Sequence, residues 1–202
     1  MQQRAVETRE RLLDTALACF GRQGYEATSV AQVCAEAGLS KGAFYHHFPS
    51  KQALFVELLG RWLASIREQL RAIDDRAQTV PEALRTMAGL MRRVFADSRG
   101  QLPLVLDFWS QARLDPEVWQ KTVTPFRDYR AYFADLIARG VARGTLHPID
   151  PEVGAQLLVS LAVGLVLQGL LDPDGADWGE VAEQAVLGMV SALESGPHGG
   201  QT

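Results

Sequence analysis

The stretch that decides the fold is Thr28-Ser-Val-Ala-Gln-Val-Cys-Ala-Glu-Ala-Gly-Leu-Ser-Lys-Gly-Ala-Phe-Tyr-His-His-Phe-Pro-Ser-Lys51. It predicts two short helices around a tight turn, followed by the start of a third. Ser29 and Gln32 have the spacing of a capping box, in which the hydroxyl accepts from a backbone N–H three residues on and the amide reaches back. Gly38 supplies the left-handed geometry that ends the first helix, and Ser40 is placed to cap the second.

The second of these helices, residues 41–47, predicts a strict division between a buried and an exposed side. Phe44 and Phe48 point inward at helical spacing. The positions that remain outside are basic, small or aromatic: Lys41, Gly42, Ala43, Tyr45, His46 and His47. This combination is typical of a helix that lies in a DNA major groove.

Net charge is compatible with DNA binding but does not by itself indicate it. The whole chain carries a formal charge of −4, whereas a basic footprint is expected of a nucleic-acid binder. The first 55 residues, however, hold six Lys or Arg against five Asp or Glu. An acidic body weakens non-specific adhesion to DNA and leaves the head to bind through local contacts.

The rest of the chain predicts only helices. Apolar residues recur at helical spacing and no strand pattern is present, so the predicted fold is all-α, with an N-terminal three-helix head on a larger helical body. The expected domains are 1–52 and 53–195, bridged by a long helix from Ser50 to about Ile73, with a flexible tail over 196–202. The predicted helices cover about 8–22, the two of the opening stretch, 50–73, 79–95, 102–113, 115–140, 150–171 and 177–193.

Val153–Leu171 is a run of 19 residues without a charge. A membrane span needs about 20 such residues, but the flanks of this run are acidic rather than rich in Lys and Arg. The preferred interpretation is a dimer-interface helix that forms a four-helix bundle with the last helix and their two symmetry mates, with burial inside one subunit as the alternative. The interface candidates are Leu158, Leu161, Leu165, Val181, Ala185 and Met189.

Residues 8 to about 60 resemble the N-terminal domain of the TetR family of bacterial transcriptional regulators. The resemblance rests on Arg11-Leu-Leu-Asp-Thr-Ala-Leu-Ala-Cys-Phe-Gly, Gly24-Tyr-Glu-Ala-Thr-Ser-Val, Ala37-Gly-Leu-Ser-Lys-Gly-Ala-Phe-Tyr-His-His-Phe and Ser50-Lys-Gln-Ala-Leu. It implies an all-helical homodimer with a DNA-binding head and a larger effector-binding and dimerisation body. The segment Leu106-Asp-Phe-Trp, together with Gly169-Leu-Leu-Asp-Pro, is similar to one frequent C-terminal subtype of that family.

The expected DNA contacts follow from side-chain chemistry. Lys51, in the first turn of its helix, and Thr28, just before another, are predicted to contact phosphates, so that removing Lys51 lowers the salt slope by about one. Lys41 and His46 are the predicted base readers. The resemblance implies that Tyr45 lies along the sugar-phosphate wall. The complete predicted set is Thr28, Ser40, Lys41, Gly42, Ala43, Tyr45, His46 and Lys51.

Three other motifs predict no chemistry of their own. His46 and His47 point about 100° apart on a helix and cannot chelate one ion. Gly38-Leu-Ser-Lys-Gly42 matches the nucleophile elbow in letters only, because that motif needs a preceding buried strand. Cys19 and Cys34 lie on apolar helix faces and are interpreted as reduced core residues. We therefore expect no catalytic set, no metal and no cofactor.

The body is expected to bind a partly apolar small-molecule effector, since its helices carry many aromatic and methionine side chains. A packed core explains each of these residues equally well, so both interpretations stay open here. The candidate pocket residues are Met87, Met91, Phe95, Trp109, Phe126, Tyr129 and Gln168, with Gln111 as a further polar group.

The sequence thus favours a ligand-responsive repressor that binds a palindromic operator as a homodimer. Its half-sites would lie about 34 Å apart, one helical turn of DNA. No signal peptide is indicated by the polar start Met1–Thr8, so a cytoplasmic protein is expected. A helical binding protein whose head has lost DNA binding is the alternative, and activation in place of repression stays open because operator position decides it. Effector, operator and regulated genes are not predicted.

Overall fold

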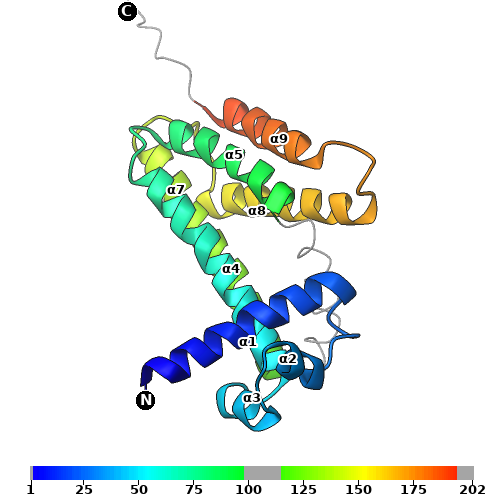
Figure 1. The fold of residues 1–202 in the computed structure, drawn as a ribbon. Coiled ribbons are helices and arrows are strands. Elements are labelled where there is room, and N and C mark those ends of the chain that lie inside the picture. The colour runs from blue at the N-terminus through cyan, green and yellow to red at the C-terminus, as the bar shows by residue number, and fades with distance from the viewer. Residues whose placement is uncertain (1, 98–114, 195–202) are drawn as a thin grey trace, which may run out of the picture. The chain divides into compact units, whose positions relative to one another are not determined.

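The computed structural model describes residues 2–97 and 115–194. Within these ranges the regular elements are all helices, so the predicted all-α fold is confirmed. The helices are α1 (Gln2–Gln23), α2 (Val30–Glu36), α3 (Lys41–His47), α4 (Lys51–Asp74), α5 (Val80–Asp97), α7 (Pro116–Ala142), α8 (Pro151–Leu171) and α9 (Trp178–Leu193), as Figure 1 shows. The predicted helix over 102–113, with Phe108 and Trp109, lies outside the described residues.

The chain forms two compact units. The first contains Met1–Ala64 and Arg99–Pro125, and the second contains Ser65–Ser98 and Phe126–Thr202. Helix α4 therefore supplies residues to both. The domain bounds expected from the sequence, 1–52 and 53–195, stay a prediction.

In the first unit, α1 packs against α2 and α3, and α2 packs against α3. The inner face of α1 is buried as its apolar spacing predicts. Its buried residues are Leu12, Leu13, Ala16, Cys19 and Phe20. Phe20, Tyr25 and Phe55 form a three-ring cluster with centroid separations of 5.1–5.5 Å, which joins the end of α1 to α4. Both cysteines are free and buried, and burial raises the pKa of each thiol.

In the second unit, α9 packs along α5 and α8 (Figure 1). The helix starts predicted for this unit are confirmed at the caps. Asp150 accepts from Glu152 N at 2.9 Å, with Pro151 in the first turn, and Asp177 accepts from Glu180 N at 3.0 Å. The core that these helices enclose contains residues from all of α4, α5, α7, α8 and α9, among them Leu70, Leu84, Leu136, Ile137, Leu158 and Val190.

Gly140 in α7 is a position where two segments of this core approach closely. A Cβ on Gly140 would lie 2.6 Å from Leu146 Cδ1 and 3.1 Å from Val80 Cβ, and both neighbours are buried. We expect Gly140→Ala to lower the free energy of unfolding by about 1–3 kcal/mol, because the core must shift to admit the methyl group.

The matched control is Gly60→Ala in α4, where a Cβ meets no atom within 4 Å. This change should raise stability by about 0.5–1 kcal/mol through helix propensity. Urea unfolding followed by circular dichroism measures both variants. Equal effects in the two would show that Gly140 is not packed as described.

Candidate nucleic-acid interface

Helix α2 begins at a serine cap. The Ser29 hydroxyl accepts from Gln32 N at 3.1 Å, which confirms the first half of the predicted capping box. The Gln32 amide has other partners: it accepts from Gln23 Nε2 at 2.6 Å and donates to Glu36 Oε1 at 3.1 Å. Gln32 thus fixes α2 to the end of α1, a contact between helices that local spacing does not reveal.

The turn between α2 and α3 has the predicted geometry. Gly38 has φ +62°, a left-handed conformation that glycine adopts without a steric penalty. Leu39 N donates to Cys34 O at 2.8 Å and closes the turn. The Ser40 hydroxyl then accepts from Ala43 N at 3.1 Å, so its predicted cap on α3 is confirmed.

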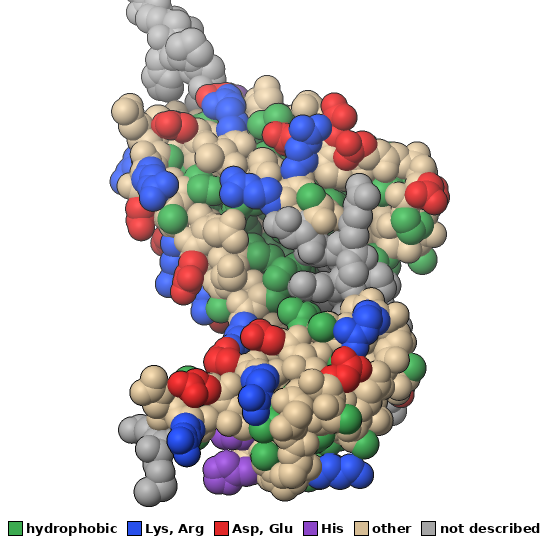
Figure 2. All heavy atoms as spheres, in the orientation of Figure 1, with side chains coloured by type: hydrophobic (Ala, Val, Ile, Leu, Met, Phe, Trp, Pro, Cys, Tyr) green, Lys and Arg blue, Asp and Glu red, His purple; other side chains and the backbone are tan. Residues whose placement is uncertain are grey.

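Helix α3 separates its apolar side from its polar side. Phe44 and Phe48 are 1% and 2% exposed, while Tyr45 is 54% exposed and touches the Phe44 ring edge-on, with centroids 5.3 Å apart. The exposed residues of α3 are Lys41, Gly42, Tyr45 and His46; Ala43 and His47 are half-buried rather than fully outward as expected. Figure 2 shows histidine side chains gathered on this part of the head.

His47 differs electrostatically from a free histidine. Burial lowers its pKa, and the neighbouring charges of His46 and Arg9 lower it further. At neutral pH the imidazole of His47 is therefore mainly neutral, since its ordinary pKa already lies below 7. Lys41 is exposed on the same helix and adds a positive charge to this surface.

Thr28 does not offer its hydroxyl to a phosphate in this structure. The residue is only 1% exposed. Its Oγ1 donates to Gly24 O at 2.8 Å and accepts from Gln23 Nε2 at 3.1 Å. In the free protein this group holds the end of α1 to the start of α2, and the phosphate contact predicted for Thr28 stays a prediction.

Lys51 likewise already has protein partners. Its Nζ donates to Tyr25 O at 2.8 Å, to Thr28 O at 3.0 Å and, more weakly, to Glu26 O at 3.4 Å. The ammonium also lies 4.2 Å from the centroid of the Tyr25 ring. Burial lowers the pKa of Lys51. In the structure the ammonium therefore points to the loop between α1 and α2, whereas the sequence predicts a phosphate as its partner.

A charged network on α1 and α4 was not predicted from the sequence. Arg9 forms a two-pronged ion pair with Glu57, and its guanidinium lies 5.0 Å from the centroid of the Phe48 ring at the end of α3. Arg61 bridges Glu57 at 3.1 Å and Glu10 at 2.5 Å. Of these contacts, only the pair four residues apart on α4 leaves a signal in the sequence. The network fixes α1, α3 and α4 together.

The predicted effector residues that the structure describes lie in the second unit and differ in burial. Met87 is buried in its core, and Met91 and Tyr129 pack against that core. Burial raises the pKa of Tyr129 to about 12. Phe126 is half-buried, and Gln168 is exposed on α8. Met87 is therefore enclosed by the core, whereas Met91, Phe126 and Tyr129 are partly accessible, and the pocket assignment of all four stays a prediction.

Phe95, four residues after Met91 on α5, packs at a contact between α5, α8 and α9. A Cβ on Gly169 would lie 2.7 Å from Phe95 Cε1 and 3.1 Å from Trp178 Cγ, so both rings pack over the glycine. The Trp178 indole N–H donates to Asp172 O at 2.7 Å. Trp109 and Gln111 lie outside the described residues.

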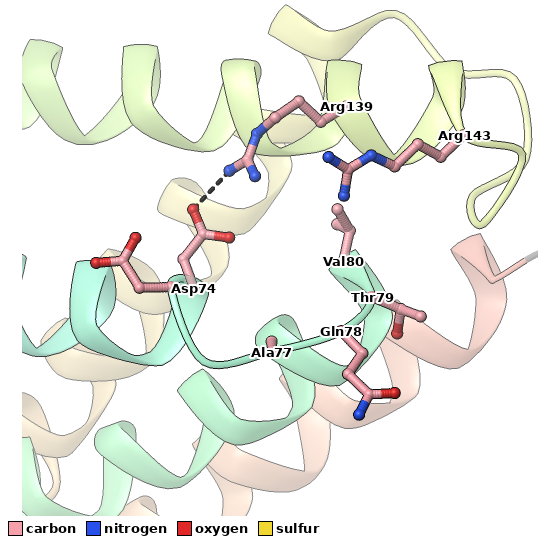
Figure 3. A pocket seen from close by; sticks show the side chains of 8 residues that line it. Asp74, Ala77, Gln78, Thr79, Val80, Arg139 and Arg143 are labelled. Atoms are coloured by element: carbon pink, nitrogen blue, oxygen red, sulfur yellow. Dashed lines mark hydrogen bonds and ion pairs between the residues drawn. The ribbon is translucent and has the colours of Figure 1, made fainter.

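A cavity of about 240 Å³ occurs at a different position in the second unit, beside the turn between α4 and α5 (Figure 3). Arg139 reaches Asp74 at 2.5 Å across it, and the guanidinium of Arg143 also faces the cavity. Its lining residues are Asp74, Asp75, Ala77, Gln78, Thr79, Val80, Arg139 and Arg143. With two carboxylates and two guanidiniums, this polar cavity does not match the partly apolar pocket that the sequence predicts.

Helix α8 carries an exposed apolar face. Its exposed residues recur at helical spacing: Val153, Leu157, Val163, Leu167 and Leu171, with Val181 exposed on α9. Leu158 and Leu165, two of the predicted interface residues, are already buried inside the protomer at 6% exposure each. These two therefore have little surface left for a partner. Leu161, Ala185 and Met189 are half-buried.

Two further properties of the described residues bear on function. By length and composition, α8 is the one described helix that is apolar enough to cross a membrane, which is weak evidence because core helices of soluble proteins share these properties. Within residues 2–97 and 115–194, no group of three or more His, Cys, Asp or Glu side chains is arranged to hold a metal.

A capped helix-turn-helix with a small, polar outer face on α3, joined to an all-α body, defines the class of helix-turn-helix transcriptional regulators. Comparisons with known proteins agree with this. Residues 12–58 match the model for bacterial regulatory proteins of the TetR family, and residues 81–193 match the model for the C-terminal domain of BetI-type transcriptional repressors.

Individual relatives are regulators as well. The chain is 26% identical to the transcriptional regulator UidR of Escherichia coli over 82% of this chain and 83% of that protein. It is 30% identical to the regulator YerO of Bacillus subtilis over 50% of this chain, a match that spans only 35% of YerO. A putative regulator from Saccharomonospora viridis, solved with choline, has the same fold at a TM-score of 0.80 and 22% identity, over 95% of this chain and all of that one.

The chain belongs to the TetR family, since one of the two family models alone covers more than half of it. It is a ligand-responsive, DNA-binding transcriptional regulator and not an enzyme. Members of the family act as dimers on operator DNA and bind small-molecule effectors.

Proposed function

We propose that this chain binds a palindromic operator as a homodimer, represses transcription there, and is released by a partly apolar small molecule. The observation that carries the proposal is the outer face of α3, where the apolar side chains are buried and Lys41, Gly42, Tyr45 and His46 are exposed. A helix of this kind enters the major groove, and two of them on a two-fold axis read half-sites about 34 Å apart.

Each exposed group on α3 has a role that its chemistry supports. Lys41 and His46 donate to base edges, and the small Gly42 and Ala43 let the helix approach, with the Ala43 methyl against a thymine methyl. Tyr45 lies along the sugar-phosphate wall and donates its O–H to a phosphate. The Ser40 oxygen accepts from Ala43 N but keeps its hydrogen, which can be donated to a phosphate.

Dimerisation is supported by the exposed apolar face of α8 and α9. Exposed apolar surface of this kind is costly in water and marks an interaction site. Leu157, Leu167 and Val181 carry it in place of the buried Leu158 and Leu165. Burying this face against its symmetry mate gives a four-helix bundle. Such an interface accounts for a helix as long and apolar as α8, so that no membrane span is needed to explain it. We accordingly place the protein in the cytoplasm.

The effector is proposed to bind beside Met91, Phe126 and Tyr129, three residues of the second unit that are half-buried. Aromatic side chains and a tyrosine hydroxyl suit a ligand with an apolar part and one polar or cationic group. Choline, present in the Saccharomonospora viridis structure, is the first compound to test on this basis.

Substitutions on α3 test the DNA-binding role. Tyr45→Ala should leave folding intact, because the side chain is 54% exposed, and should lower affinity for every duplex by about tenfold. Lys41→Ala should instead cost about 1–3 kcal/mol on the operator and less on random DNA. Operator sequences selected from a random duplex pool, followed by fluorescence anisotropy, measure both. Equal loss on operator and random DNA for Lys41→Ala would remove it as a base reader.

A further inference from the structure

Lys51 brings together three backbone carbonyls that lie 23–26 residues away in the chain. Its Nζ is 2.8 Å from Tyr25 O, 3.0 Å from Thr28 O and 3.4 Å from Glu26 O. An ammonium has three hydrogens to donate and no acceptor. These three carbonyls use all of them, so a phosphate would have to displace a protein contact to reach Lys51.

The surroundings of Lys51 indicate a built site. The ammonium lies 4.2 Å from the centroid of the Tyr25 ring, a cation–π distance. Tyr25 is itself buried and packs edge-on against Phe55 of α4, with centroids 5.1 Å apart. Two independent contacts, the ring cluster and the lysine, therefore tie the same loop to the first turns of α4.

The loop that Lys51 holds leads directly into α2, the first helix of the helix-turn-helix. Thr28, whose carbonyl accepts from Lys51, precedes the Ser29 cap of α2, and its hydroxyl binds Gly24 O. Helix α2 packs against both α1 and α3. A change in the position of this loop relative to α4 therefore moves α2 and with it the recognition helix.

We propose that Lys51 is a positioning residue for DNA reading: its ammonium fixes the loop between α1 and α2 to the start of α4 and so sets the orientation of α3 relative to α4. This inference rests on the proposed DNA-binding function. It replaces the phosphate contact expected at Lys51 from the sequence.

The test compares Lys51→Met, which keeps the aliphatic stem, with Lys51→Arg, which keeps the charge on a planar fork that cannot point at three carbonyls together. Lys121→Met, at an exposed lysine of α7, is the control. Each purified full-length variant is titrated against the selected operator and a scrambled duplex at four salt concentrations. Stoichiometric titration gives the active fraction, and thermal melting shows whether the variant is folded.

If Lys51 is a positioning residue, its variants lose part of their preference for the operator over the scrambled duplex and keep all of their phosphate contacts. Both Lys51 variants should bind the operator about tenfold more weakly and the scrambled duplex less than about threefold more weakly, with the wild-type salt slope. The Arg variant gives this answer even if the Met variant does not fold. Lys121→Met should behave as the wild type.

Two results would overturn the inference. Equal loss on both duplexes with a salt slope about 0.9 smaller in Lys51→Met, together with rescue by Lys51→Arg, would make Lys51 a phosphate contact. A lower active fraction with unchanged affinities per active molecule would make its role structural only. Failure of the wild type to bind any duplex would instead remove the proposed function, and the inference with it.

Discussion

Phe44→Ala is expected to unfold the DNA-binding head. The Phe44 ring is 1% exposed and lies 5.9 Å from the Phe48 ring and 5.3 Å from the Tyr45 ring, centroid to centroid. Replacing a fully buried phenylalanine by alanine costs about 3–5 kcal/mol through lost transfer energy and an unfilled cavity. That cost is most of the stability of a small domain, because domains are stable by only about 5–15 kcal/mol.

Thermal melting followed by circular dichroism, together with operator binding, measures this loss. The neighbouring variant Tyr45→Ala is the matched control, since it removes an aromatic ring of similar size from the exposed side of the same helix. Phe44→Ala should lose both its melting transition for the head and its DNA binding, whereas Tyr45→Ala should keep the melting transition and bind DNA about tenfold more weakly. A Phe44→Ala protein that melts and binds as the wild type would contradict the packing described for α3.

Leu157→Asp is expected to dissociate the homodimer. The Leu157 side chain is 50% exposed in the protomer and lies on the apolar face that we propose to be buried between subunits. An aspartate there would have to leave water without a partner, a cost of about 3 kcal/mol or more, which raises the dimer dissociation constant more than a hundredfold. The protomer itself should fold normally, because the carboxylate stays in water.

Analytical ultracentrifugation measures the dissociation, and the operator affinity should fall with it because one head reads one half-site. Ala131→Asp, at an exposed alanine of α7, is the control and should remain dimeric. Leu158→Asp distinguishes the two sides of α8: this residue is buried inside the protomer, so its variant should lower the melting temperature as well. A dimeric Leu157→Asp protein would place the interface elsewhere.

The parts of the head that follow from the sequence are those fixed by contacts within a few residues. The Ser29 and Ser40 caps join atoms three residues apart, and Gly38 alone can adopt the conformation of the turn cheaply. The burial of Phe44 and Phe48 follows from helical spacing. Such features could be predicted because chain connectivity brings their partners together.

The roles of Thr28 and Lys51 could not be predicted in this way. The partners of Lys51 lie 23–26 residues earlier in the chain, and they are backbone carbonyls, which every residue has. No side-chain spacing marks them. The same holds for Arg9, whose partner Glu57 is 48 residues away.

The dimer face shows a different limit of prediction from sequence. Helix α8 is apolar all round, so its two sides do not differ in hydrophobicity. The sequence therefore does not tell which side faces the protomer core and which faces outward. Leu157 and Leu158 are equivalent in chemistry, yet one is half exposed and the other is buried. Only the packing of α8 against α9 and the core decides between them.

Binding of the wild-type protein to DNA tests the central claim most directly. Fluorescence anisotropy with the duplex upstream of its own gene, and with a scrambled duplex of the same length, should be measured at low and at physiological salt. The account predicts binding of one dimer per duplex that favours the upstream DNA by at least about a thousandfold and weakens steeply with salt. Failure to bind the upstream duplex, the scrambled duplex and every member of a random pool at low salt would contradict it.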